Sequence, residues 1–242
     1  MALKQIIKST LMKCSSVIYR NDESKVIYYH DVHSNDSYTS MSTPLELFKK
    51  HIDIIQEQGY KIVDKITHPE REVLITFDDG FRGLYENFSY FVENQIPVKI
   101  FLIVEYMGGK NYLSKAEVFE LLNTGLVTIG SHTLTHRNLD ELTDDEIAKE
   151  LKESKQRLEE MFGIEINEFC YPRGRFNDKV VELSRKSGYT LQYSCLPGSF
   201  SESNDIVKRN FVQHESSKDF LYHLQGGGEI FYRRYLKQQV RG

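Results

Sequence analysis

Short runs of apolar residues alternate along the chain with longer segments in which apolar residues recur every three or four positions. Such runs are typical of buried strands, and the recurring spacing is typical of helices with one buried face. Strand and helix alternate seven or eight times, which favours a parallel sheet with right-handed crossovers. The expected strands are 26–30, 61–64, 73–77, 98–104, 127–130, 166–171, 189–194 and 206–212.

Local signals mark where several helices begin and end. Thr43 and Pro44 predict the start of a helix that ends at Gly59. Capping-box spacings predict two further starts, at 114–117 and at 143–146, the second opening the longest helix, which runs to Met161. Helices are also expected at 178–186 and 217–225, and after residue 80 with four inward residues: Leu84, Phe88, Phe91 and Val92.

Two adjacent carboxylates follow the strand 73–77. Asp78 and Asp79 cannot both be ionised in a dry site without a cation or a shared proton. About fifty residues later another apolar run leads to His132 and His136, whose spacing predicts one face of a helical turn. One Asp and two His side chains would form a catalytic metal site with an open position, leaving the second Asp free as a base.

Each of these motifs also has a simpler interpretation. Asp-Asp-Gly after a strand is often only a turn, and a His-x-x-x-His pair is often a solvated helix face. Because each motif follows its own apolar strand, their combination favours a site. In a parallel barrel the C-terminal ends of the strands meet at one face, where barrel enzymes bind substrate. An open doubly wound sheet is the alternative, because it would also bring these motifs together at its strand ends.

Length and composition predict one domain over residues 1–242, with its core at about 26–225. The chain has 242 residues, is 40% hydrophobic and carries a net charge of −4. That charge and the absence of a Gly-rich phosphate loop argue against nucleic acid as a partner. Three scattered cysteines, Cys14, Cys170 and Cys195, favour reduced thiols over a disulfide framework.

Residues 1–20 form an amphipathic segment. Lysines at 4, 8 and 13 are interleaved with Leu3, Ile6, Ile7 and Leu11, without the continuous apolar centre of a secretory signal. Packing against the domain is the favoured interpretation, and weak contact with an anionic membrane surface is the alternative. The basic stretch 233–237 raises the same alternative. We therefore expect a cytoplasmic or inner-membrane-associated protein, and the sequence leaves its oligomeric state open.

Three motifs together resemble those of the polysaccharide deacetylases, the NodB-homology or family-four carbohydrate esterases. They are Thr76-Phe77-Asp78-Asp79-Gly80, Ser131-His132-Thr133-Leu134-Thr135-His136 and Tyr171-Pro172-Arg173-Gly174. The resemblance covers about residues 26–225. It implies an α/β fold, a distorted (β/α) barrel with about seven parallel strands.

The resemblance also implies roles for individual residues. Asp78 would be the general base that activates a metal-bound water. Asp79, His132 and His136 would hold one divalent ion, zinc in most relatives, with cobalt, nickel or manganese as alternatives. The backbone N–H of Arg173 would be an oxyanion donor, and Tyr171, Pro172 and Tyr193 would contact substrate.

The departing amine needs a proton. The chain is similar to the exopolysaccharide N-deacetylase subgroup in which a histidine on the first strand supplies it, so His30 is assigned as the general acid, with a core histidine as the alternative. Two departures from the family pattern stand out. Cys170 replaces an arginine that orients the catalytic Asp, with Arg173, Arg175 and Arg209 as candidate substitutes. The chain contains no tryptophan, the residue that forms the wall of the acetyl pocket in many relatives. Tyr193 is the preferred candidate for that wall, and Leu191 is the alternative.

These observations lead to three functional hypotheses. The first is a metal-dependent hydrolase that removes N-acetyl groups from a glycan or oligosaccharide containing N-acetylhexosamine, with O-deacetylation open to the same machinery. The second is a deacetylase or amidohydrolase of a small amide or a lipid-linked sugar precursor. The third is a carbohydrate-binding barrel that has lost turnover.

Overall fold

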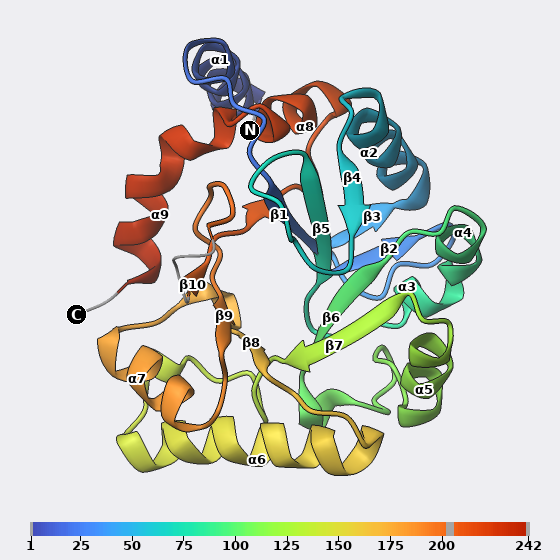
Figure 1. Cartoon of the computed structure of the whole chain (residues 1–242), viewed down its shortest axis with the longest axis vertical. Helices are drawn as coiled ribbons and strands as arrows, with labels where there is room; N and C mark the ends of the chain where they lie inside the picture. The colour runs from blue at the N-terminus through green and yellow to red at the C-terminus, as the bar shows by residue number, and fades with distance from the viewer. Residues whose placement is uncertain (1, 202–205, 241–242) are drawn as a thin grey trace.

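A parallel sheet that curls into an open barrel forms the centre of the computed structural model, which describes residues 2–201 and 206–240 (Figure 1). The hydrogen-bonded order is β10-β9-β8-β7-β6-β5-β1-β11, with β4 beside the first half of β5. The strands are β1 (Lys25–Tyr29), β4 (Lys61–Val63), β5 (Glu72–Phe77), β6 (Val98–Leu102), β7 (Val127–Ser131), β8 (Glu168–Cys170), β9 (Leu191–Tyr193), β10 (Ile206–Val207) and β11 (Asn210–Phe211). A separate pair, β2 (Asp31–His33) and β3 (Ser42–Pro44), follows the end of β1.

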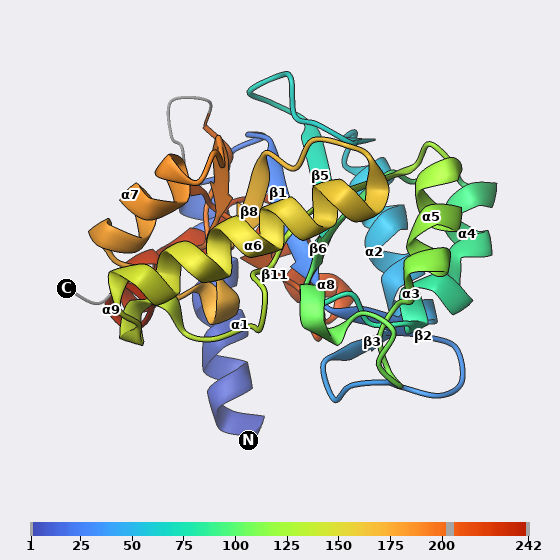
Figure 2. The ribbon, with the colours of Figure 1, turned by 90° about the horizontal axis from the view of Figure 1, so that it is seen from below.

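Helices surround the sheet (Figures 1 and 2). They are α1 (Ala2–Ile18), α2 (Leu45–Glu57), α3 (Gly83–Glu86), α4 (Phe88–Glu93), α5 (Lys115–Asn123), α6 (Asp144–Phe162), α7 (Asp178–Lys186), α8 (Ser217–Leu224) and α9 (Tyr232–Gln239). Both predicted capping boxes are confirmed, at Ser114 and at Thr143. No helix in the ranges 2–201 and 206–240 is long and apolar enough to span a bilayer.

The predicted barrel of about seven parallel strands is confirmed, with its last strand broken. The run 206–212 forms β10 and β11, which lie at opposite ends of the strand order and are joined by Lys208 and Arg209. No ladder between β10 and β11 occurs in the described part of the chain. The backbone N–H of Arg209 instead donates to the carbonyl of Leu196 at 2.9 Å. The barrel is therefore open where Arg209 crosses from one edge to the other.

Alternation along β5 separates two apolar cores. Val73, Ile75 and Phe77 join the large core between sheet and helices, whereas Leu74 belongs to a small cluster inside the barrel. The other members of the small cluster are Val26, Val63, Ile66, Phe101, Cys170, Tyr193 and Val207. Continuing the alternation brings Asp78 to the inner face, directly above this apolar floor.

Several predicted elements differ from the observed ones. The helix expected after residue 80 is two short helices that meet at Asn87, and Val92 is 41% exposed rather than inward. Side-chain hydrogen bonds from Asn87 to the carbonyls of Gly83 and Val32 accompany this break. The helix predicted at Thr43 starts two residues later, because residues 42–44 pair with β2.

Candidate active site

A buried ion pair fixes Asp78. Two nitrogens of the Arg209 guanidinium donate to its carboxylate, Nη1 to Oδ1 at 2.6 Å and Nη2 to Oδ2 at 2.8 Å. Burial alone would raise the pKa of Asp78, but the charge and hydrogen bonds of Arg209 outweigh it and hold the pKa at about 2. Asp78 is therefore an anion throughout the neutral pH range.

Arg209 is the arginine, among the three candidates, that contacts Asp78. Arg173 donates to the side chain of Asn138, and Arg175 to those of Asp140 and Glu141. Cys170, which stands where relatives have an arginine, places its Sγ 2.8 Å from Nη2 of Arg209. The small thiol thus leaves space for a guanidinium that arrives from the segment between β10 and β11.

Other groups fix the plane of the Arg209 guanidinium. Its Nε donates to the carbonyl of Ser194 at 2.9 Å, and Nη1 donates to Thr76 Oγ1 at 3.1 Å. The ring of Tyr28 faces the guanidinium carbon at 4.4 Å, and that of Phe101 lies at 5.5 Å. These contacts fix the guanidinium of Arg209. Because it also forms two hydrogen bonds with Asp78, the carboxylate is held in one orientation.

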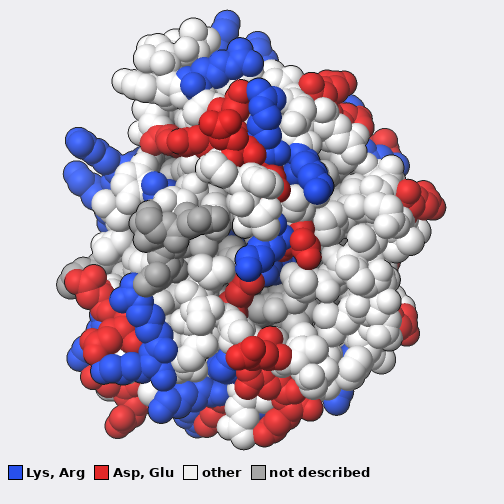
Figure 3. Space-filling view, viewed as in Figure 1, with Lys and Arg blue, Asp and Glu red and all other residues white. Residues whose placement is uncertain are grey.

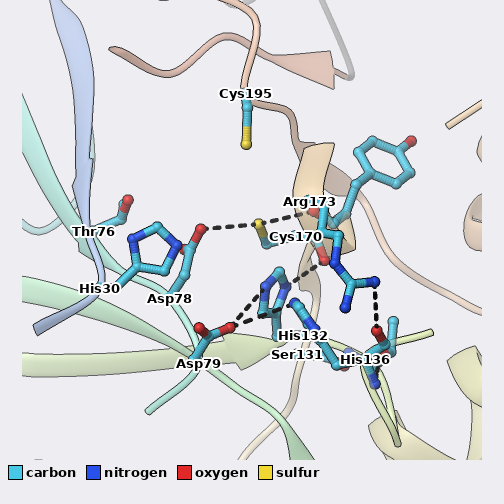
Figure 4. A network of polar contacts seen from close by, with 12 residues as sticks. His30, Thr76, Asp78, Asp79, Ser131, His132, His136, Cys170, Arg173 and Cys195 are labelled. Atoms are coloured by element: carbon cyan, nitrogen blue, oxygen red, sulfur yellow. Dashed lines mark hydrogen bonds and ion pairs between the residues drawn. The ribbon is translucent and has the colours of Figure 1, made fainter. Parts of the chain in front are cut away.

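Asp79 has a different environment from Asp78. Its Oδ1 lies 3.4 Å from Nε2 of His132 and 3.5 Å from Nε2 of His136 (Figure 4). Burial lowers the pKa of both imidazoles, that of His136 to about 3, so both are neutral. Nδ1 of His132 donates to the carbonyl of Cys170 at 2.8 Å, so its Nε2 presents a lone pair to Asp79.

These three side chains fit a metal ion. Asp79 Oδ1 is buried without a hydrogen-bond partner among the described groups, and two imidazole nitrogens face it. The three ligand atoms lie within 4.8 Å of one another. Lone pairs that converge in a buried site repel one another unless a cation lies between them. Two imidazoles and a carboxylate suit zinc and neighbouring transition metals.

The histidines lie on a loop, so the predicted helical turn is wrong. Thr133 and His136 have positive φ angles, of 72° and 62°, which interrupt any helix. Glu150 of α6 holds this loop: its carboxylate accepts the backbone N–H groups of Leu134 and Thr135, at 3.0 and 2.9 Å, and the hydroxyl of Thr135. The sequence analysis missed Glu150; its signal is a carboxylate on the inward face of a helix, beside Ile147 and Leu151.

His30 follows β1 and lies beside Asp78 and Asp79 (Figure 4). Its Nδ1 lies 2.7 Å from Oε1 of Gln213, an acceptor, so Nδ1 carries the hydrogen. Gln213 is 1% exposed, and the hydroxyl of Thr43 donates to its carbonyl at 2.7 Å. Gln213 was also missed, because it follows the broken last strand and no motif marks it.

Tyr171 and Tyr193, two of the predicted substrate contacts, have buried side chains. Tyr171 is fully buried, stacked on Phe176, and its hydroxyl donates to Gln192. Tyr193 is 2% exposed, and its hydroxyl donates to Glu168, at the opposite end of the strands from Asp78. Leu191 begins β9 at that same far end.

Other residues of the motifs have different surroundings. Pro172 is buried within a short 3₁₀ helix, η3 (Pro172–Gly174), in which Arg173 has a φ of 55°.

An aromatic ring near Asp79 is that of Tyr112, whose pKa is raised by burial and by the charge of Asp79. It packs between Phe81 and the partly exposed Tyr106.

Comparisons with known proteins agree with this geometry. Residues 65–192 match the family described as polysaccharide deacetylase. YxkH of Bacillus subtilis, which carries the family's name, is 30% identical over 201 residues, covering 78% of this chain and 70% of that protein. The poly-beta-1,6-N-acetyl-D-glucosamine N-deacetylase of Staphylococcus aureus is 29% identical over 174 residues, covering 65% of this chain and 60% of that protein.

Solved structures resemble this chain in fold. IcaB from Ammonifex degensii has a TM-score of 0.76 at 22% identity, covering 86% of this chain and 99% of that one. The Streptococcus pyogenes deacetylase PplD has a TM-score of 0.74 at 19% identity, covering 84% and 98%.

Replacing Arg209 should destabilise the metal-free protein in a pH-dependent way. Arg209→Gln leaves Asp78 buried without a countercharge, which costs about 3–5 kcal/mol of unfolding free energy. The pair stabilises the fold above the ordinary Asp pKa of about 3.9, and this stabilisation is lost as pH falls through about 2. Without Arg209, burial raises the pKa of Asp78, so the variant can neutralise this carboxylate by protonation more readily at pH 4 than at pH 7. Urea unfolding should therefore show a larger loss of stability at pH 7 than at pH 4.

The double variant Asp78→Asn/Arg209→Gln provides the control for this prediction. It removes both charges, so it should be less destabilised than the sum of the two single variants. A loss of unfolding free energy that does not change with pH, or additive effects of the two substitutions, would contradict a stabilising ion pair between Asp78 and Arg209.

Replacing Glu150 should weaken metal binding while the protein stays folded. Glu150→Gln removes the negative charge and leaves one acceptor oxygen where the carboxylate has two, so the loop with His132 and His136 loses part of its support. Isothermal titration with zinc should show an affinity about 10- to 100-fold lower. Glu153→Gln, on the same helix but paired with Arg157 at the surface, should bind zinc like the wild type.

Proposed function

This chain belongs to the polysaccharide deacetylase family, and from that premise we propose that it removes N-acetyl groups from a glycan containing N-acetylhexosamine. Members of the family are carbohydrate deacetylases that depend on a metal ion. The Staphylococcus aureus relative acts, by its name, on poly-beta-1,6-N-acetyl-D-glucosamine, and this chain spans 60% of its length. We propose the same class of substrate here, a polymer or oligomer of N-acetylated hexosamine.

One observation carries the proposal: two neighbouring carboxylates have opposite environments. Asp78 is held as an anion by Arg209, and Asp79 faces two neutral imidazoles without a partner. A merely structural Asp-Asp-Gly turn would need neither arrangement. The arrangement supports one carboxylate as a proton acceptor and the other as a metal ligand.

Asp79, His132 and His136 are the residues that we propose hold the ion. Zinc is our first choice because imidazole and carboxylate together suit it, with cobalt, nickel and manganese as alternatives. When bound, such an ion supplies Lewis-acid chemistry, polarising the acetyl carbonyl and making water more acidic.

Asp78 is the proposed general base. It is ionised at neutral pH and held in one orientation, so it is available to take the proton of the attacking water. The backbone N–H of Arg173 is the proposed donor to the oxygen that becomes negative as the carbonyl is attacked. Supporting this, Arg173 is anchored beside the histidine loop, where its side chain donates to Asn138 at 2.6 Å.

His30 is the proposed general acid that protonates the departing amine. The hydrogen bond to Gln213 occupies Nδ1 and orients the ring, so Nε2 is the atom from which a proton could be delivered. We further propose that Gln213 is a positioning residue for this step. Its side-chain amide is neutral, and its backbone is held by the hydroxyl of Thr43, which donates to the backbone carbonyl of Gln213.

Acetate release should require both the metal and Asp78. The wild type, stripped with a chelator and reloaded with zinc, cobalt or nickel, should release acetate from N-acetylglucosamine oligomers and from a partly acetylated polymer. Asp78→Asn should lower kcat by about 10²- to 10⁴-fold while metal binding persists. Since this variant leaves Arg209 unpaired, Asp78→Asn/Arg209→Gln should be assayed beside it, with circular dichroism to confirm folding.

The alternatives predict other results. Zinc binding without acetate release from any glycan, but with release from a small amide or a lipid-linked sugar, would replace our substrate class by the precursor hypothesis. Saturable glycan binding without turnover would favour a carbohydrate-binding barrel. Failure to bind any metal would contradict the assignment of Asp79, His132 and His136.

Gln213→Leu should impair only the reaction that needs an acid. An amine must be protonated as it leaves, whereas 4-nitrophenolate is a good leaving group that needs no proton. We expect kcat to fall about 10- to 100-fold on N-acetylglucosamine oligomers with little change in KM. The same variant should hydrolyse 4-nitrophenyl acetate at nearly the wild-type rate.

His30→Ala should reproduce this pattern, and His68→Ala, which removes an exposed histidine that precedes β5, should leave both activities unchanged. Equal losses of Gln213→Leu on both substrates would mean that Gln213 supports the fold or the metal loop instead.

A further inference from the structure

The first helix of the chain has its apolar side turned outward. Six aliphatic residues of α1 are exposed, among them Leu3 at 71%, Ile6 at 61% and Val17 at 74%. The other exposed aliphatic residues are Ile7, Leu11 and Ile18. At about 3.6 residues per turn they share one face, so α1 presents to its surroundings an apolar stripe in which only Thr10 and Cys14 are not aliphatic.

Mainly polar contacts hold the opposite face of α1 to the domain. Lys8 forms an ion pair with the buried Glu215, and the hydroxyl of Ser9 donates to Asp219 on α8. The other buried residues on this face are Met12, Ser15 and Ser16. The prediction that this segment packs against the domain is thus confirmed, but it is the polar side of the helix that makes the contacts. The apolar side stays exposed.

The charged side chains of α1 itself are all basic. Lys4 and Lys13 fall on the two borders of the apolar stripe, and residues 2–20 contain no Asp or Glu. Residues 230–240 also lack acidic residues, and α9 exposes Arg233, Arg234 and Lys237. A groove between α1 and α9 is lined by apolar and basic side chains from both, namely Ile7, Leu11, Phe231, Lys4, Lys8 and Arg234, together with the polar Gln5, Tyr235 and Gln238.

The face seen in Figure 3 mixes acidic and basic side chains over most of its area. In Figure 2 the N-terminal end of α1 projects beyond the other elements, on the side where β2 and β3 follow the C-terminal end of β1. That is the side of the barrel on which Asp78, Asp79 and His30 lie.

We propose that α1, together with the basic side of α9, binds the surface of an anionic lipid bilayer. The apolar stripe would enter the boundary between headgroups and acyl chains, and the lysines at its borders would remain at the phosphate level. Because α1 projects on the active-site side, this contact brings the ends of the strands towards the membrane. The charge complementarity favours lipid over a second copy of this chain, whose matching surface carries the same positive charge.

Vesicle flotation tests the proposal. The full chain should float with vesicles of phosphatidylcholine containing phosphatidylglycerol, much less with phosphatidylcholine alone, and less in high salt. Lys4→Gln/Lys13→Gln should weaken partitioning about fivefold for each lysine removed. Ile6→Gln/Val17→Gln should reduce it at least tenfold, whereas Ile164→Gln, an exposed apolar residue elsewhere, should not.

The proposal stands apart from the proposed function, since both variants should keep wild-type acetate release from soluble oligomers. No flotation of the folded wild type with anionic vesicles would overturn it, as would equal flotation with neutral vesicles. Sedimentation that shows a dimer lost in Ile6→Gln/Val17→Gln, without vesicle binding, would assign the stripe to a second copy.

Discussion

The bidentate ion pair between Asp78 and Arg209 is the interaction on which the rest of the site depends. A carboxylate on the inner face of the barrel, above an apolar floor, would be protonated or would destabilise the fold if it were alone. Arg209 reaches it from the segment that bridges the open edge of the barrel. The same residue therefore closes the structure and fixes the charge of the proposed base.

Neighbouring carboxylates acquire different properties because the chain turns between them. Asp78 continues the inward alternation of β5, and Asp79, with a φ of 71°, turns towards the histidine loop. One side chain meets a permanent cation, and the other meets two neutral imidazoles. Such a division lets adjacent identical residues serve as proton acceptor and metal ligand.

Support for the site comes from residues that carry no motif. Glu150 fixes the loop of His132 and His136 from α6, and Gln213 orients His30 from beyond the last strand. Two residues after Gln213, Glu215 binds Lys8 of α1. The proposed lipid-binding helix is thus attached to the domain close to the residue that holds the proposed acid.

The sequence by itself determined the alternation of strands and helices, the capping boxes, the family and the candidate ligands, because these depend on short-range periodicity and on motifs a few residues long. It could not choose Arg209 among three arginines, nor find Glu150 and Gln213, since their partners lie 131, 15 to 16 and 183 positions away. It did not reveal that the side chains of Tyr171 and Tyr193 are buried, and it wrongly placed the histidines on a helical turn. Which way a side chain points, and which charge meets it, depends on how the barrel folds back on itself, and this only the tertiary structure decided.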